Sequence, residues 1–168
     1  MRVRIAVVVA VVFLAMLKAQ PVLAVSMAGP TSATVSGWSL SSSGTSTISG
    51  GTLTVSALLS SYTVTVQADK STMSEYTGGA YVSGGKRLGA ALHVITVRTG
   101  GSGLSCNGAG QNATVGTGVV TVASGPGGLL CSDIYSVTLS QTTAISDTAL
   151  VPGHTYHIIL TYTLSGGL

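Results

Sequence analysis

The sequence predicts an all-β protein, an antiparallel β-sandwich with Ig-like or jelly-roll connections. The C-terminal segment His154–Ser165 alternates apolar and polar side chains with period two, which is typical of a half-buried strand. Further short segments of this kind follow one another along the chain, separated by Gly, Ser and Pro turn signals. No segment has the helical periodicity that a coiled coil or an α/β fold requires.

The first 24 residues are expected to form a signal peptide and not to be part of the fold. Two arginines precede the apolar run Ile5–Leu17, and a Val-Leu-Ala stretch ends at Ala24. We expect cleavage after Ala24, with Ala28 as the alternative site. A retained membrane anchor is the competing interpretation. The run is short for a membrane span, and Lys18 follows it directly.

The formal net charge of +3 belongs entirely to this leader, which contains Arg2, Arg4 and Lys18. The remaining chain has equal numbers of basic and acidic residues: Lys70, Lys86, Arg87 and Arg98, and Asp69, Glu75, Asp133 and Asp147. The high pI therefore does not predict binding to nucleic acid or to anionic lipid. A neutral surface rich in Ser and Thr favours association between copies.

The expected strands are, in order, Thr31–Ser41, Gly51–Leu59, Tyr62–Ala68, Arg87–Thr99, Ala113–Ala123, Asp133–Gln141 and His154–Ser165. Residues 69–85 are expected to form a long loop or small excursion, and residues 100–111 a Gly-rich loop. Gly116 and Gly118 suggest a bulge or close backbone approach within one strand. We expect the centre of Arg87–Thr99 to be buried on both faces.

Apolar side chains mark the inward face of three of these segments. In the first the row is Leu53, Val55, Ala57 and Leu59; in the second it is Tyr62, Val64, Val66 and Ala68; in the last it is Tyr156, Ile158, Leu160, Tyr162 and Leu164. Trp38, the single tryptophan, is expected to anchor the core or rim at the first strand.

Two cysteines, Cys106 and Cys131, are expected to form a disulfide in an exported chain. Closing a loop of that length contributes about 3 kcal/mol in the chain-entropy description. Two buried free thiols are the alternative. A zinc site would need more ligands at suitable spacing.

Residues that carry chemistry are sparse, so no catalytic, metal or cofactor site is predicted and an enzyme is not expected. His154 and His157 are three apart on a strand and so point to opposite faces, while His93 lies mid-strand. Asp69 and Glu75 lie in one loop without the clustered oxygen ligands of a calcium site. No nucleophile elbow, phosphate loop or dinucleotide motif is present.

Asn112 begins a glycosylation sequon, Asn-Ala-Thr, just before an expected strand. Because it lies next to a Gly-rich loop, we expect the asparagine to be accessible to a glycosylating enzyme. The aromatic residues show no pattern typical of a sugar-binding platform.

The segment that follows the signal peptide, residues 25–35, is expected to be an extended arm. Its apolar residues share one parity: Val25, Met27, Ala33 and Val35. Pro30 is unsuited to a central strand, which favours an arm that completes the sheet of a neighbouring subunit. Repeated head to tail, this contact makes a filament. The alternatives are that the segment is the first strand of its own sandwich or a disordered leader.

Two patches resemble secreted fibre-forming β-sandwich proteins. Gly51–Val55 (GTLTV) is similar to a strand of the TasA and camelysin-like biofilm fibre subunits. In that group a Pro-Gly pair usually comes earlier in the chain than Pro152-Gly153 does here. Pro152–Tyr156 (PGHTY) is similar to the opening of terminal strands in pilin-like modules, such as archaeal bundling pilins and spore-coat-U-type pilins. The resemblance implies donor-strand polymerisation and a structural role in cell-surface fibres or biofilm matrix.

We therefore expect an extracellular structural subunit of a pilus-like filament, with residues 36–168 as the sandwich and identical subunits as partners. Membrane contact is expected during export alone, and no nucleic acid is expected to bind. The alternative is a monomeric cell-surface adhesin or carbohydrate-binding sandwich, with a glycan or surface receptor as partner. A secreted hydrolase is the third and weakest interpretation.

Overall fold

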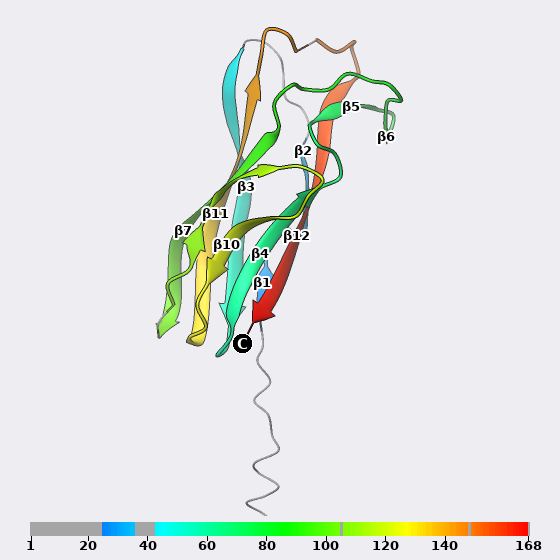
Figure 1. The fold of residues 1–168 in the computed structure, drawn as a ribbon. Helices are drawn as coiled ribbons and strands as arrows, with labels where there is room; N and C mark the ends of the chain where they lie inside the picture. The colour runs from blue at the N-terminus through cyan, green and yellow to red at the C-terminus, as the bar shows by residue number, and fades with distance from the viewer. Residues whose placement is uncertain (1–24, 36–42, 105, 148, 168) are drawn as a thin grey trace, which may run out of the picture.

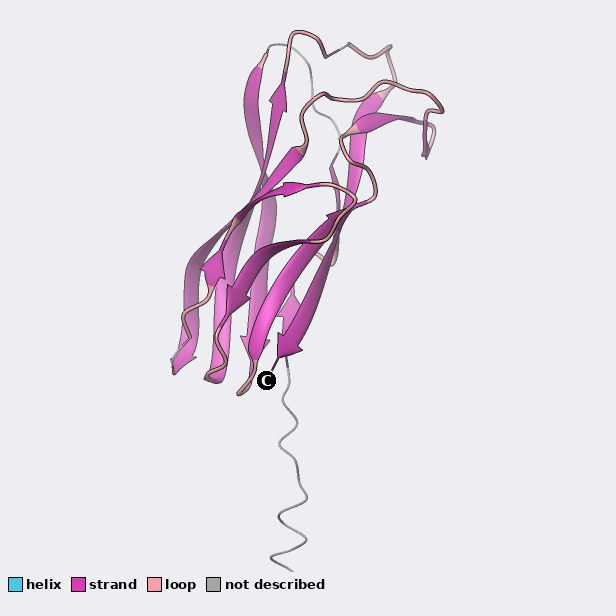
Figure 2. Ribbon diagram, viewed as in Figure 1, coloured by secondary structure: helices cyan, strands magenta, loops and turns pink. Residues whose placement is uncertain are grey.

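Two antiparallel sheets face each other in the computed structural model, which describes residues 25–35, 43–104, 106–147 and 149–167 (Figures 1 and 2). The predicted all-β sandwich is thus confirmed. The expected signal peptide and Trp38 lie outside the described residues. In the described part of the chain, no helix is long and apolar enough to cross a membrane.

The strand order of each sheet brings together segments that are far apart in the sequence. The first sheet runs β1 (Val25–Ala28), β3 (Gly44–Ala57), β11 (Leu129–Thr143), β7 (Leu92–Leu104) and β9 (Asn112–Val115). The second runs β6 (Ala80–Tyr81), β5 (Ser74–Thr77), β12 (Thr155–Gly167), β4 (Ser61–Ala68), β10 (Val120–Gly125) and β8 (Ala109–Gly110), with β2 (Ser32–Val35) also paired to β12.

The core lies between the sheets and is built from the alternating rows of the long strands. The predicted rows of β4 and β12 are confirmed, since Tyr62, Val64, Val66, Ala68, Tyr156, Ile158, Leu160 and Tyr162 are all buried, with Leu164 partly buried beside them. The facing sheet contributes Leu53, Val55, Ala57, Leu92, Val94, Tyr135, Val137 and Leu139. Period-two alternation therefore places the correct faces inward.

Leu59 is the exception in its predicted row. Strand β3 ends at Ala57, and Leu59 lies in the turn to β4 with a φ of 54° and about half of its side chain exposed. Its N–H donates to the carbonyl of Gly128 at 3.0 Å. The prediction was wrong here because the tight turn breaks the alternation before the apolar run ends.

The predicted strand Ala113–Ala123 is two strands in different sheets. Strand β9 pairs with β7 in the first sheet, and β10 pairs with β4 in the second. The chain crosses between the sheets at residues 116–119, where the carbonyl of Gly116 accepts a hydrogen bond from the N–H of Ala68 (2.9 Å). The two glycines that suggested a bulge mark a crossover instead.

Two loop predictions also change. The Gly-rich segment after Thr99 continues β7 as far as Leu104, where it pairs with β11, and residues 69–85 contain the short strands β5 and β6. The centre of β7 is not buried on both faces, because Val94 is buried while His93 and Ile95 are partly exposed. Glycine lowers strand propensity, but pairing with a long neighbouring strand overrides it.

Candidate assembly interface

The N-terminal segment bridges the two sheets along one side of the sandwich. Strand β1 pairs antiparallel with the end of β3, from Val25 opposite Ala57 to Ala28 opposite Thr54. Strand β2 pairs antiparallel with the middle of β12, from Ser32 opposite Thr161 to Val35 opposite Ile158. The expected single arm is therefore two short strands, one in each sheet.

Gly29 and Pro30 make the switch between the sheets. Gly29 has a φ of 137°, a conformation that favours glycine, and a Cβ on it would lie 2.7 Å from the carbonyl oxygen of Thr52. Pro30 has no N–H to offer a strand ladder. The two residues end β1 and let the chain cross to the second sheet.

Strand β1 shows the alternation expected of a strand on a sandwich edge. Val25 and Met27 are partly buried and pack against the core, whereas Ser26 and Ala28 are exposed. Val25 also reaches the second sheet, because a Cβ on Gly166 of β12 would lie 3.0 Å from one of the Val25 methyl groups. The segment thus covers an edge that both sheets share.

In the single chain, both halves of this segment pair with the chain's own sheets. Donation of Val25, Met27, Ala33 and Val35 to a neighbour stays a prediction. Among the described residues, the side of β3 away from β11 is paired only over Thr54–Ala57. Removal of the segment would expose further backbone groups on β3 and on β12, which is the kind of edge that accepts an added strand.

One end of the sandwich is marked by exposed leucines, and we call it the leucine end. Its members lie in the β3–β4 turn, at the end of β7 and at the start of β11: Leu59, Leu104, Leu129 and Leu130. The first described residue, Val25, lies opposite Ala57 and so at the same end. Figure 1 shows this end at the bottom, where β12 finishes.

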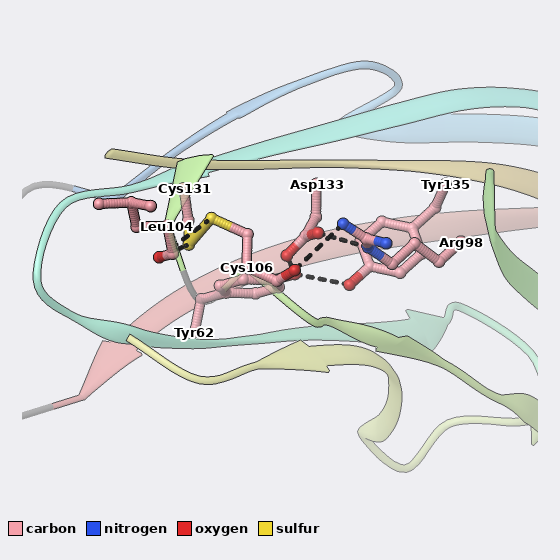
Figure 3. Close-up of a disulfide and its surroundings, with 7 residues drawn as sticks. All are labelled: Tyr62, Arg98, Leu104, Cys106, Cys131, Asp133 and Tyr135. Carbon is pink, nitrogen blue, oxygen red and sulfur yellow. Dashed lines mark hydrogen bonds and ion pairs between the residues drawn. A yellow bond between two sulfur atoms is a disulfide. The ribbon is translucent and has the colours of Figure 1, made fainter. Parts of the chain in front are cut away.

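The predicted disulfide is confirmed at the leucine end. Cys106 and Cys131 are bonded, with their Cα atoms 5.2 Å apart and 25 residues between them in sequence. The bond ties the chain just after β7 to the start of β11 (Figure 3). The strand ends that display Leu104 and Leu130 are therefore covalently linked.

A buried polar network lies next to the disulfide (Figure 3). Asp133 is fully buried, accepts a hydrogen bond from the Tyr62 hydroxyl at 2.5 Å and forms an ion pair with the Arg98 Nε at 2.5 Å. The hydroxyls of Tyr62 and Tyr135 lie 2.5 Å apart. Burial raises the pKa of both tyrosines, so their hydroxyls stay protonated and can donate.

This network fixes the loop after β7 in place. The charges of Arg98 and Asp133 compensate each other, and Gly108 covers the network so closely that any Cβ there would overlap the hydroxyls of Tyr62 and Tyr135. The arrangement holds the loop after β7 against the core.

The opposite end carries Glu75 and His154, two of the ionisable residues that the sequence singled out, and we call it the loop end. It comprises the described part of residues 144–154 and the β5–β6 hairpin (Figure 1). The His154 Nδ1 lies 2.6 Å from a Glu75 carboxylate oxygen, whose partner oxygen accepts the Lys86 backbone N–H at 2.8 Å. These contacts, the Lys86 N–H first, lower the pKa of Glu75.

The other two histidines are not brought together with His154. The ring of His157 is buried and stacks on Tyr76 with centroids 4.0 Å apart, and burial lowers its pKa. His93 lies in β7, with its Nδ1 3.3 Å from the Asn112 side-chain oxygen. No group of three metal-ligating side chains occurs among the described residues.

Asn112 is exposed at the start of β9, on the edge of the first sheet. Glycosylation of this residue stays a prediction. Asp69, the other acid considered for calcium, accepts hydrogen bonds from the Tyr81 hydroxyl (2.6 Å) and the Ile159 N–H (2.9 Å). Its oxygens therefore hold the chain after β4 against Tyr81 of β6 and Ile159 of β12.

Comparison of the chain with protein-family models, curated proteins and solved structures finds no match in any of the three. The resemblance to fibre-forming subunits therefore stays a prediction.

Proposed function

We propose that the chain is an extracellular structural subunit that assembles into a filament by exchange of its N-terminal strands. The observation that carries this proposal is the bridging position of residues 25–35, which pair with both sheets across one shared edge. A segment that covers an edge in its own subunit can cover the same edge in a neighbour with the same contacts. The disulfide is typical of an oxidising compartment and agrees with an extracellular location.

Exchange costs little because the interactions that residues 25–35 make with their own subunit form again with the neighbouring subunit. Each large apolar side chain placed against the core contributes about 1.5–3 kcal/mol, and each backbone hydrogen bond about 1 kcal/mol. Val25 and Met27 supply the first kind of interaction, and the two ladders supply the second. Subunit concentration then decides between closed monomers and open chains.

Replacing Met27 by Asp does not test this proposal cleanly. Met27 packs against the chain's own core, so the substitution would destabilise the monomer as well as the exchanged form. A variant that keeps the segment in place without changing its apolar contacts separates the two effects.

The register of β2 and β12 offers such a lock. Thr34 lies opposite Ile159, both side chains are exposed, and the neighbouring hydrogen bond runs from the Tyr162 N–H to the Thr31 carbonyl (2.9 Å). By the alternation of an antiparallel ladder, Thr34 and Ile159 form a non-hydrogen-bonded pair with Cα atoms roughly 4.5 Å apart. That distance suits a disulfide.

The experiment compares T34C/I159C with its matched control T34S/I159S by negative-stain microscopy of purified protein. We expect the control to form filaments and the oxidised double-cysteine variant, with both disulfides verified by intact mass, to remain dispersed. Filaments from the locked variant would contradict strand exchange. Dispersed particles from both the control and the unmodified protein, together with glycan binding, would favour the adhesin alternative.

A further inference from the structure

Gly166 stands where the inward row of β12 would carry a further side chain. The inward residues of this strand alternate over Tyr156–Leu164, and Gly166 is the next position of the same parity, opposite the buried Tyr62 of β4. A Cβ on Gly166 would lie 3.0 and 3.1 Å from the two methyl carbons of Val25 and 3.2 Å from the Ser60 hydroxyl oxygen. Strand β1 therefore closes the shared edge by placing Val25 against a glycine of the other sheet (Figure 1).

The contact with Val25 explains why this position is a glycine. Gly166 is not among the glycines with a positive φ, so its backbone conformation is open to other residues. A separation of 3.0 Å is shorter than the roughly 3.5–4.0 Å at which carbon atoms pack. Even one methyl group on Gly166 would thus overlap with Val25, whereas a smaller side chain in place of Val25 would leave room for it.

Gly29 fixes where residues 25–35 sit along the edge. A slip of this segment by one residue would turn its apolar side chains outward, because side chains alternate along a strand. A slip by two keeps that parity but brings Met27 or Thr31 to the place of Gly29. There the φ is 137° and a Cβ would lie 2.7 Å from the carbonyl oxygen of Thr52, so a residue with a side chain does not fit. One register alone satisfies both conditions.

We propose that strand exchange is specific for a second copy of this chain in a single register, with Gly166 selecting Val25 and Gly29 fixing the register. This inference rests on the proposed filament function and names what its exchange site recognises. A segment from another protein would need a first side chain that fits against Gly166 and a glycine four residues later. Specificity of this kind comes from excluding wrong partners as well as from binding the right one.

The test is a competition between two donor chains for one acceptor chain. The acceptor is I159C, and the donors T34C and T34C/V25A are mixed with it in equal amounts, allowed to assemble and then oxidised. Intact mass distinguishes the two covalent heterodimers. We expect the donor that retains Val25 to be cross-linked about fivefold more often, because its methyl groups fill the space at Gly166.

The preference should reverse when the acceptor is I159C/G166A. The added methyl group overlaps with Val25 but not with the smaller side chain of the T34C/V25A donor, which should now be cross-linked about fivefold more often. The acceptor's own Val25 is hindered in the same way, which leaves its edge open to the incoming segment. A general loss of stability cannot reverse the ratio, because both donors compete for the same acceptor.

Matched controls lie next to each substituted residue. Ser26 is an exposed residue of β1, and a Cβ on Gly167 would meet the Ser61 hydroxyl oxygen at 3.1 Å instead of Val25. The donor T34C/S26A should compete equally with T34C. The acceptor I159C/G167A should keep the preference for Val25. A reversal with I159C/G167A would show that any added methyl group at this strand end changes the ratio.

The register is tested with T161C as the acceptor. Thr161 lies opposite Ser32, and a two-residue slip would bring it opposite Thr34 instead. We expect T34C to cross-link to I159C at least about tenfold more often than to T161C, because cysteines two residues out of register are too far apart for a disulfide. Equal yields would overturn the single register.

The outcomes separate this inference from the proposed function. Heterodimers whose ratio does not change with I159C/G166A would overturn the selection of Val25 by Gly166 and leave strand exchange in place. Absence of every heterodimer would contradict strand exchange, and this inference with it. The contact is also tested within one chain, where V25A/G166A should melt at a higher temperature than G166A because the overlap is relieved. A lower melting temperature for the double variant would overturn the inference even if an acceptor variant failed to fold.

Discussion

The two ends of the sandwich are held by different kinds of interaction. The leucine end has a disulfide and the fully buried Asp133 carboxylate, which bonds to Arg98 and Tyr62, whereas the loop end has the Glu75–His154 pair and the stack of His157 on Tyr76. A disulfide keeps two chain segments together even when non-covalent contacts open locally, whereas an ion pair or a ring stack does not. The end where the N-terminal segment begins is therefore the one that is braced by a covalent bond.

The largest expected effect comes from breaking the buried network at the leucine end. Asp133→Ala leaves Arg98 without its partner and removes the acceptor of the Tyr62 hydroxyl. We expect the free energy of unfolding to fall by about 3–5 kcal/mol in urea titrations. Asp133→Asn, which keeps the size and one acceptor oxygen, should cost less. A loss below roughly 1 kcal/mol for the alanine variant would show that the network does not hold this end.

The disulfide is expected to have the next largest effect. Replacing both Cys106 and Cys131 with Ser should lower the free energy of unfolding by about 3 kcal/mol, because the bond closes a 25-residue loop in the unfolded chain. Urea titration of the oxidised protein and the variant measures the difference. Equal stabilities would mean that the non-covalent contacts alone fix the leucine end.

The loop end is expected to respond to acid. Because the folded pKa of Glu75 lies below its ordinary value of 4.5, the stability it contributes is present above that value and is lost as the pH falls through the folded pKa. Unfolding midpoints measured from pH 6 to pH 3 should therefore fall below about pH 4.5. Glu75→Gln should flatten that part of the profile, and parallel profiles for the two proteins would contradict this assignment.

The smallest expected effect concerns the strained turn at the leucine end. Leu59→Gly removes a left-handed leucine that is half exposed, so we expect a gain of up to about 1 kcal/mol in the free energy of unfolding. The matched variant Leu58→Gly changes a residue without a positive φ and should be destabilising. The melting temperatures of the two variants, compared with that of the unmodified protein, test this prediction. A lower melting temperature for Leu59→Gly would show that the buried half of the Leu59 side chain stabilises the fold by more than the left-handed conformation costs.

The inward rows of the long strands could be predicted from the sequence, because period-two alternation directly reports which face is buried. The same reasoning overlooked the network around Asp133. Asp133 shares the inward parity of Tyr135 and Val137 in β11, and an acid in such a row was the available signal. Its partners Tyr62 and Arg98 come from β4 and β7, so pairing them required knowledge of the sheet topology.

The N-terminal segment shows why local parity was insufficient. Val25 and Met27 face the core from the first sheet, while Ala33 and Val35 belong to a strand that pairs in the second. The turn at Gly29 and Pro30 separates them, although all four share one parity in the sequence. The crossover at residues 116–119 was overlooked for the same reason, since alternation does not show where a chain changes sheets.

Strand exchange between subunits is tested most directly by a cross-link that can form only across a subunit boundary. T34C and I159C are placed on separate chains, mixed in equal amounts, allowed to assemble and then oxidised. Because Thr34 lies opposite Ile159, exchange predicts a covalent dimer of one T34C and one I159C chain on non-reducing gels, confirmed by mass. Filaments that form in the mixture without this heterodimer would show that residues 25–35 stay in their own subunit, and would contradict the proposed mechanism.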